Sequence, residues 1–407
     1  MEHRPCGRAW RLSALLLALA LLLSGCWSRR ELNELAVVVA MGVDLHRSGY
    51  KVTAQIVNFK EASKNTSSDV MSVVTYQAIG ESVPEALQRM LGEVPRQLYL
   101  SHLRVMVFGE ALARRGLTEV LDFVARNHQF RTDFPMLVAH RSEASDVLKV
   151  VTPIDNIPAN SLFSSILVSS KKWAATGRVT LQQFVARLDL EGSDPVLSGV
   201  EVIGDKTKGT TDAIWHTLKP NTLLRHSGLA VFKRDKLVGW LEEQGSKTVN
   251  YLLNDVSTTN TTFKCPDDEK RTISMQLQRV ESEIEVVLRG EELTGFNVRV
   301  RAEANLDSVQ CPIDMGKPDS IPAIERKLEE RIVQVFDRHV GKVQKQFNVD
   351  IFGLGEVLHR RHPKIWKKYK RDWDEHFKET PVTVQANVKL RRVGSIVQPL
   401  KKDMVTR

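Results

Sequence analysis

The sequence of 407 residues has few cysteines, few aromatic residues and no long hydrophobic run. Four cysteines exclude a small disulfide-dense domain, and 23 glycines with 15 prolines exclude a collagen-like or low-complexity chain. The longest predominantly apolar run, Leu12–Leu23, has 12 residues. A helix that crosses a bilayer needs about 20, so a polytopic membrane protein is also excluded. A hydrophobic content of 42% and a charged content of 26% are typical of a globular chain with room for two or three domains.

The motifs of common catalytic and metal sites are also missing. The sequence has no Gly-x-Ser-x-Gly elbow, no Cys-x-x-Cys pair and no His-Glu-x-x-His segment. The segment Gly204–Gly209 has the glycine spacing of a phosphate-binding loop but lacks the lysine that contacts the terminal phosphates. His359 and His362 have two arginines between them, which repel a cation, and no carboxylate beside them. We therefore predict no enzyme, no metal site and no dissociable cofactor.

The N-terminus carries the features of a bacterial secretion signal. Three arginines precede the apolar run, and a cysteine follows it directly at Cys26. The end of the run resembles a lipobox, the site at which signal peptidase cleaves before a lipid-modified cysteine; its residues are Leu23, Ser24 and Gly25. The pattern predicts a signal peptide over residues 1–25 and a covalent diacylglyceryl lipid on Cys26. The alternative is an ordinary signal peptide with a chance cysteine.

The positive charge of the chain is local. The formal net charge is +9, and it becomes +7 once residues 1–25 are removed. Between His359 and Lys402 there are 13 lysines and arginines but only four acidic residues. The rest of the mature chain is therefore slightly acidic, which argues against nucleic acid as a partner of the whole chain.

Two cysteines remain in the body of the mature chain, Cys265 and Cys311. Outside the cytoplasm such a pair forms a disulfide when its geometry allows, which would close a loop of about 47 residues. Two separate buried thiols are the alternative, and the spacing by itself does not decide between them.

Hydrophobic periodicity predicts a mixed α+β fold of several domains, with mixed sheets flanked by helices. Strands and helices alternate over residues 26–151, which we take as an N-terminal α/β domain. A loop rich in proline begins a middle domain or subdomain at residues 152–221. Residues 222–402 form a strand-rich C-terminal domain with two long helices, one over Ile321–Phe347 and a basic one that begins near Pro363.

The basic helix presents two kinds of residue. Aromatic side chains recur at helical spacing and are predicted to lie in the core: Trp366, Tyr369, Trp373 and Phe377. Basic residues lie off this stripe and are a candidate interaction face: Lys364, Lys367, Lys368 and Arg371. Such a face suits anionic lipid headgroups or an acidic partner, or is simply solvated. An aromatic platform for nucleic acid is the less favoured interpretation of the stripe.

Several segments resemble a known family, in the family's order and over nearly the whole mature chain. The segments are Cys26–Leu35, Met41–Asp44, Leu98–Val105, Phe108–Leu112, Leu121–Val124, Gly228–Lys233, Leu237–Leu241, Asp350–Glu356, His359–Pro363 with Trp366, and Val388–Gly394. By these motifs the chain resembles the Ger(x)C family of spore germination lipoproteins. Ser28 departs from the aspartate often found there.

The resemblance implies the C subunit of a nutrient germinant receptor, needed for receptor assembly and the germination response. Such a subunit is lipid-anchored on the outer face of the spore inner membrane, beside integral-membrane A and B subunits. It also implies a three-domain mixed α/β fold without catalytic activity. The alternative is a solute-binding lipoprotein of a transporter. That function requires two doubly wound lobes around a cleft, and the strand-rich second half argues against it.

Overall fold

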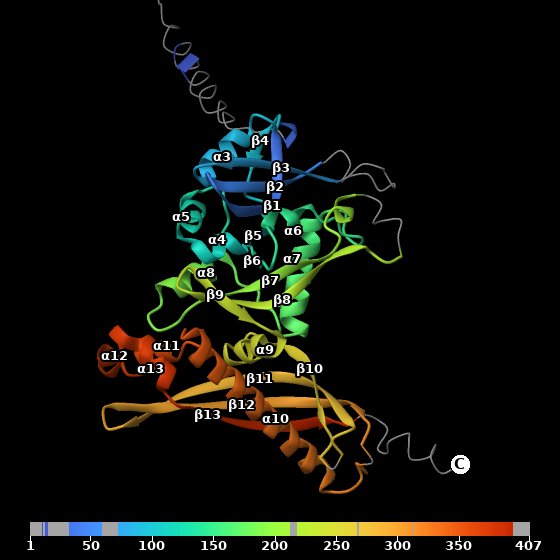
Figure 1. Ribbon diagram of the computed structural model, residues 1–407, viewed down its shortest axis with the longest axis vertical. Coiled ribbons are helices and arrows are strands. Elements are labelled where there is room, and N and C mark those ends of the chain that lie inside the picture. Colours follow the sequence, from blue (N-terminus) through green and yellow to red (C-terminus); the bar gives the residue numbers. More distant parts are fainter. Residues whose placement is uncertain are drawn as a thin grey trace, which may run out of the picture.

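The structure is a computed structural model that describes residues 10, 13–14, 32–58, 72–211, 218–266, 268–311 and 313–393. Two β-sheets lie one above the other along the long axis, and helices flank both of them (Figure 1). The predicted mixed α+β class is therefore confirmed. Within the described ranges, no helix is both long enough and apolar enough to cross a membrane.

The first sheet has nine strands in the described part of the chain, in the order β3-β2-β1-β5-β6-β7-β8-β9, with β4 paired to β1. Its centre, from β1 through β5 and β6 to β7, is parallel, and hairpins extend it at both edges. The bounds are β1 Leu35–His46, β2 Gly49–Val57, β3 Val73–Gly80, β4 Gln97–Tyr99, β5 Val105–Gly109, β6 Met136–Ala139, β7 Val196–Gly204, β8 Thr222–Lys233 and β9 Lys236–Leu241.

Helices cover both faces of this sheet, which explains why β1 is a nearly continuous apolar run buried on both sides. Four helices pack on one face: α3 Val83–Met90, α4 Glu110–Arg115, α5 Thr118–Arg126 and α8 Leu181–Asp189. Two cover the other face: α6 Ala144–Lys149 and α7 Pro158–Lys172. Two 3₁₀ turns, η1 Leu32–Glu34 and η2 Lys208–Thr210, lie outside this core.

The second sheet has four strands in the order β10-β11-β12-β13. The bounds are β10 Thr258–Lys264, β11 Thr272–Arg289, β12 Glu292–Val309 and β13 Val382–Arg392. Buried and exposed residues alternate along the long β11–β12 hairpin, so only one face of this sheet is covered. A doubly wound second lobe, as a solute-binding lipoprotein requires, is not what the described residues form.

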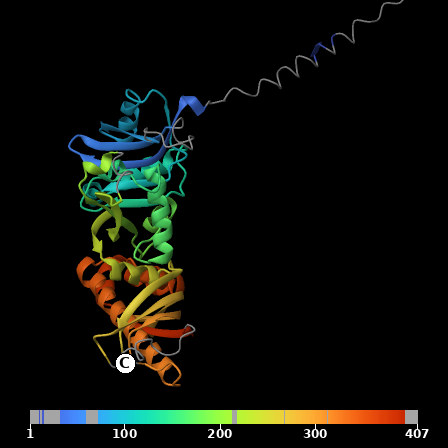
Figure 2. The same cartoon turned by 90° about the vertical axis from the view of Figure 1, so that its right-hand side faces the viewer.

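Helices α9 Glu243–Leu252, α10 Ser320–Lys342 and α11 Leu354–Arg361 cover that face (Figure 2). The long helix predicted over Ile321–Phe347 is confirmed as α10, which continues as a π-helical turn, η4, over Val343–Phe347. The basic helix predicted from Pro363 is not continuous. It consists of α12 Pro363–Tyr369, the 3₁₀ turn η5 Lys370–Asp372 and α13 Trp373–Glu379.

The edges of the two sheets do not coincide with the domain limits expected at residues 151 and 221. Strand β7 pairs in parallel with β6, and β8 and β9 continue the same sheet. The first sheet therefore extends from Leu35 to Leu241, because backbone pairing joins segments that the loop at residues 152–160 separates in sequence. Residues of β7, β8 and β9 also belong to the hydrophobic core of the second sheet, so the two sheets share one core at their junction.

Candidate functional site

The residues predicted for lipid attachment, Leu23, Ser24, Gly25 and Cys26, lie outside the described residues. The two remaining cysteines do lie within them. Cys265 follows β10, Cys311 follows β12, and a disulfide joins them with their Cα atoms 5.9 Å apart. The bond links the C-terminal end of β10 to the C-terminal end of β12, and both cysteine side chains are buried.

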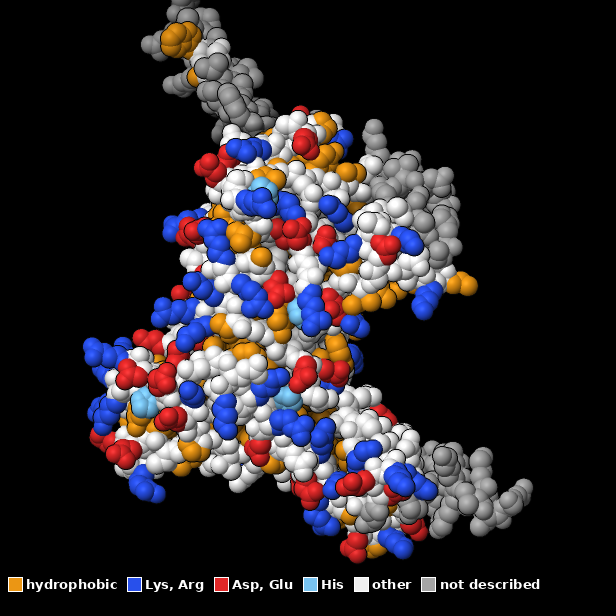
Figure 3. Space-filling model, in the orientation of Figure 1, with side chains coloured by type: hydrophobic (Ala, Val, Ile, Leu, Met, Phe, Trp, Pro, Cys, Tyr) orange, Lys and Arg blue, Asp and Glu red, His pale blue; other side chains and the backbone are white. Residues whose placement is uncertain are grey.

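The basic side chains of α12 and η5 are exposed, as predicted. Lys364, Lys367, Lys368 and Arg371 all lie on the surface. Acidic side chains lie among them, and Figure 3 shows blue and red side chains side by side around α12. Lys368, for example, pairs with Glu291 of the β11–β12 turn. The surplus positive charge of the segment is therefore partly neutralised within the chain, while Lys364 and Lys367 pair with no described carboxylate.

The aromatic residues behind this face are buried. Trp366, Trp373 and Phe377 are 2%, 5% and 0% exposed, and Tyr369 is half-buried. The rings of Trp366 and Trp373 meet edge to face, with their centroids 5.3 Å apart. The predicted core role of the stripe is thus confirmed, although a 3₁₀ turn breaks the helix that carries it.

A buried carboxylate, Asp350, organises the segment just before α11. Its two oxygens accept five N–H donors, which are the backbone amides of Phe352, Gly353, Leu354 and Gly355 and the indole Nε1 of Trp373, at 2.8 to 3.2 Å. Burial raises the pKa of Asp350 to about 6, although these donors favour the ionised form. We call Asp350 and these five donors the Asp350 knot.

The loop between α8 and β7, residues 190–195, docks on this knot. One hydrogen bond joins the loop to the knot, from Asp194 N to the Asp350 carbonyl at 2.8 Å. Two more join it to the helices that follow: Glu356 N of α11 donates to the Gly192 carbonyl at 3.1 Å, and Trp366 Nε1 of α12 donates to the Glu191 carboxylate at 2.7 Å. An ion pair of 2.6 Å between Lys233 and Asp374 adds a further link between the two units. The junction therefore depends on directional polar contacts as well as on the shared core.

A cleft of about 690 Å³ opens beside the junction, between the 190–195 loop and η5. Its charged lining mixes both signs: Asp189, Glu191, Asp194, Lys233, Arg234, Asp235, Lys370, Arg371 and Asp374. Burial raises the pKa of Asp194, which accepts a hydrogen bond from the Arg234 amide. In this lining Asp235 accepts hydrogen bonds from the hydroxyl of Thr118 at 2.7 Å and from its backbone amide at 3.1 Å, at the start of α5. No metal-binding group of three ligands occurs in the described part of the chain.

Sequence reasoning missed the 190–195 loop. Glu191 and Gly192 stand in an ordinary turn sequence, and no local pattern reveals that their partners lie beyond residue 350. Gly192 has a φ of +76°, and a Cβ there would lie 2.7 Å from the Gly355 backbone. A glycine between two acidic residues, Glu191 and Asp194, in a short loop was the one available signal, and it is weak.

Other residues in the recognised motifs are also structural. Asp44 is buried and accepts hydrogen bonds from Ala144 N at 2.7 Å and Ser145 N at 3.0 Å, at the start of α6. Glu110 accepts the indole N–H of Trp240 at 3.2 Å. These motifs therefore hold helices against the first sheet.

Two sheets joined by polar contacts around the Asp350 knot define a multi-domain protein of mixed α+β class. Two family models match its halves. One, described as the spore germination protein N-terminal domain, covers residues 28–202; the other, described as spore germination B3/GerAC like, C-terminal, covers residues 227–394. The chain belongs to this family of spore germination proteins.

Similar proteins match almost end to end. Spore germination protein KC of Bacillus subtilis (strain 168) is 31% identical over 399 residues, which cover 96% of this chain and 97% of the relative. Spore germination protein GerQC of Bacillus cereus is 21% identical, with 93% and 98% covered. A crystal structure of the GerBC protein has a TM-score of 0.55 at 19% identity and covers 86% of this chain and 96% of that one. The fold is therefore shared with a germination protein.

Proposed function

We propose that this protein is the lipid-anchored, non-catalytic C subunit of a spore nutrient germinant receptor. In this proposal the mature chain begins at Cys26, which carries a diacylglyceryl group. The lipid holds the protein on the outer face of the spore inner membrane, beside integral-membrane A and B subunits. Two acyl chains on one cysteine satisfy the need for more than one hydrocarbon tail in stable anchoring.

The observation that carries the proposal is membership of a germination family over both halves of the chain. A protein that only carried a germination domain would match one half. The motifs at the junction support a role as a rigid body within an assembly, because Asp350, Glu191 and Trp366 are all engaged in joining the two units.

Within this proposal the exposed basic side chains on α12 are the contact with an anionic partner or with lipid headgroups. Lys364 and Lys367 support it because no described carboxylate neutralises them, while the aromatic residues behind them hold the helix in place. Electrostatic contacts of this type set orientation and association rate more than affinity.

The test uses the full chain in a spore-forming host that lacks its own copy of the gene. Cys26→Ala is compared with Cys6→Ala, which changes a cysteine inside the predicted signal peptide. We expect the wild type and Cys6→Ala to reach the membrane fraction with a mass that equals residues 26–407 plus lipid, and to support germination. Cys26→Ala should leave the membrane fraction or stay unprocessed, with germination reduced. An unmodified Cys26 in functional spores would contradict the proposal.

A further inference from the structure

The two edges of the second sheet differ in whether their outward backbone groups are hydrogen-bonded. Strand β13 forms one edge, and helix α10 closes it with glutamate side chains. Glu329 accepts a hydrogen bond from Val388 N at 2.9 Å, and Glu325 accepts one from Leu390 N at 2.8 Å. These carboxylates occupy backbone donors that would otherwise be free to pair with another strand.

Strand β10 forms the other edge, and part of it is open. Cys265 N donates to the Arg271 carbonyl, and the β10–β11 register continues from there without a shift. Because antiparallel pairs alternate, residues 259, 261 and 263 bond to β11, while Asn260, Thr262 and Lys264 direct their backbone N–H and C=O groups outward. These outward groups have no hydrogen-bond partner among the described residues. At the other end of the strand, the Thr259 hydroxyl donates to the Trp173 carbonyl, so only residues 260–264 are open.

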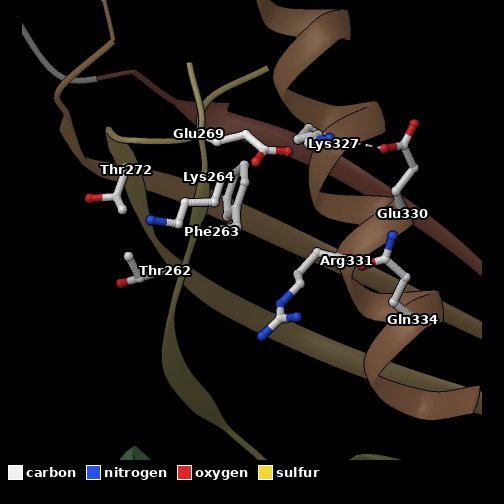
Figure 4. A pocket seen from close by; sticks show the side chains of 9 residues that line it. All are labelled: Thr262, Phe263, Lys264, Glu269, Thr272, Lys327, Glu330, Arg331 and Gln334. Carbon is white, nitrogen blue, oxygen red and sulfur yellow. Dashed lines mark ion pairs between the residues drawn. The ribbon is translucent and has the colours of Figure 1, made fainter. Parts of the chain in front are cut away.

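A hollow of about 470 Å³ lies between this open edge and helix α10 (Figure 4). The guanidinium of Arg331 extends from the helix toward the strand, whereas the carboxylate of Glu330 is directed toward Lys327. Lys327 pairs with Glu330 at 3.5 Å, but Arg331 has no ion-pair partner within the described ranges. An unpaired cation therefore faces the space beside an unpaired strand edge.

A second hollow of about 240 Å³ adjoins the first, and both are lined by Thr262 and Arg331. Its apolar lining comes from α9, β11 and α10: Tyr251, Leu277, Ile332, Val335 and Phe336. The rings of Tyr251 and Phe336 stack with centroids 6.1 Å apart, which gives this hollow an aromatic wall. The groove along β10 thus offers one apolar and one cationic position in succession.

We propose that the open edge of β10 accepts an extended segment of a partner protein as a fifth strand of the second sheet. The segment places an apolar side chain in the aromatic-walled hollow and a carboxylate against Arg331. Alternate residues of a strand lie about 6.5 to 7 Å apart on one face, so the two side chains stand two positions apart. Backbone hydrogen bonds supply much of the affinity in this mode of recognition, and the two side-chain positions supply specificity. This site is separate from the basic face on α12 and does not depend on a lipid anchor.

The probe is a labelled seven-residue peptide, Ser-Leu-Thr-Glu-Thr-Leu-Ser, whose Leu and Glu share one face in either direction of pairing. A matched peptide carries Lys in place of Glu. Both are titrated to about 1 mM against the purified mature chain by fluorescence anisotropy. We expect saturable binding of the Glu peptide, about tenfold tighter than the Lys peptide, a ratio that corresponds to about 1.4 kcal/mol.

Three variants make the test specific. Arg331→Glu should reverse the preference between the two peptides, while Arg338→Glu, on the same helix but outside the groove, should leave it unchanged. Thr262→Pro removes one outward N–H and should abolish binding of both peptides, with folding checked by circular dichroism. The proposal would be overturned if Arg331→Glu still bound the Glu peptide more tightly than the Lys peptide. It would also be overturned if the wild type showed no saturable binding of the Glu peptide.

Amide hydrogen exchange gives an independent readout. In the free chain the outward amides of Asn260, Thr262 and Lys264 should exchange quickly and those of Thr261 and Phe263 slowly. Bound Glu peptide should slow the outward set alone. Protection that spreads evenly over the strand would indicate general stabilisation instead of strand addition. A dimer that Thr262→Pro converts to a monomer would show that a second copy of the chain is the occupant, which also overturns the proposal.

Discussion

Trp366 donates its indole N–H to the carboxylate of Glu191 across 175 positions of sequence, at 2.7 Å. The donor is almost completely buried beneath α12, while the acceptor side chain remains half exposed in the 190–195 loop. The hydrogen bond from Trp366 also lowers the pKa of the Glu191 carboxyl. One bond therefore links the core of the second sheet to a loop of the first, and the stability of the junction can be tested at this point.

Truncation of the buried indole should destabilise the second sheet. Trp366→Ala removes a side chain that is 2% exposed, and the resulting cavity is expected to cost about 3–5 kcal/mol of the free energy of unfolding. Urea denaturation followed by circular dichroism measures the change. Lys367→Ala, next in sequence but exposed, is the control and should change stability little. A loss below about 1 kcal/mol for Trp366→Ala would mean that the stripe is not part of the core.

A methyl group at Gly192 should separate the two units. Gly192 has a φ of +76°, and an added Cβ would meet the Gly355 backbone and the Trp366 ring at 2.7 Å. Gly290 has a similar φ of +64° but nothing within 4 Å, so Gly290→Ala carries the backbone strain without the collision. We expect Gly192→Ala, and not Gly290→Ala, to increase cleavage of the 190–195 loop in limited proteolysis. Equal sensitivity of the two variants would show that strain alone matters.

The Asp350 carboxyl should give stability a specific pH dependence. Burial raises its pKa in the folded protein from 3.8 to about 6, so the folded state binds more protons than the unfolded state between these values. The contribution of Asp350 to stability is therefore fully present below pH 3.8 and is lost as the pH rises through about 6. Asp350→Asn lacks this titration.

The difference in unfolding free energy between wild type and Asp350→Asn should fall from pH 4 to pH 6 and then level off. Urea unfolding at several pH values measures this difference and cancels the other titrating groups. A difference that rises over the same interval would show that the five N–H donors outweigh burial.

The disulfide between Cys265 and Cys311 should leave neither cysteine with a free thiol that can be labelled. A maleimide added to the unfolded, unreduced mature chain should leave these two residues unmodified, and mass spectrometry of the peptides reads the result. The double variant Cys265→Ser, Cys311→Ser lacks the bond. Its free energy of unfolding should be lower by about 2–4 kcal/mol, mainly because the unfolded chain gains entropy. Complete labelling of both cysteines before reduction would contradict the bond.

Charge reversal on α12 should separate assembly from folding. Lys364, Lys367 and Lys368 are exposed, so changing all three to Glu should leave the unfolding transition nearly unchanged. Under the proposed function it should weaken co-purification with the membrane subunits, and salt should reduce the difference from wild type. Changing the same three residues to Arg keeps the charge and is the control. Normal germination with the reversed charges would show that this face is only solvated surface.

The local pattern of hydrophobic residues was sufficient to predict much of the fold. The apolar run of β1 and the helical spacing of the apolar residues in α10 each follow from the faces that a strand or helix buries. The burial of Trp366 and Trp373 followed from the same argument, because an aromatic stripe beside lysines has one apolar side. The sequence motifs were also sufficient to identify the family, since they are spread over both halves of the chain.

Tertiary structure decided where these elements pair. The continuation of the first sheet through β7, β8 and β9 depends on backbone hydrogen bonds, which are available to every residue and leave no mark in the sequence. The break at Lys370–Asp372 lies between two segments of equally good helical pattern, and it accompanies the approach of Trp373 to Asp350.

Sequence patterns alone were enough to predict the buried aromatic stripe, the charged surface beside it and the family that the chain resembles, because these are properties of single residues and short periods. Only the tertiary structure decided that Glu191 meets Trp366, that Glu325 and Glu329 close one edge of the second sheet, and that β10 leaves the other edge open. Each of these is a contact between residues far apart in sequence, and its energy arises only when folding brings the two groups within hydrogen-bond distance.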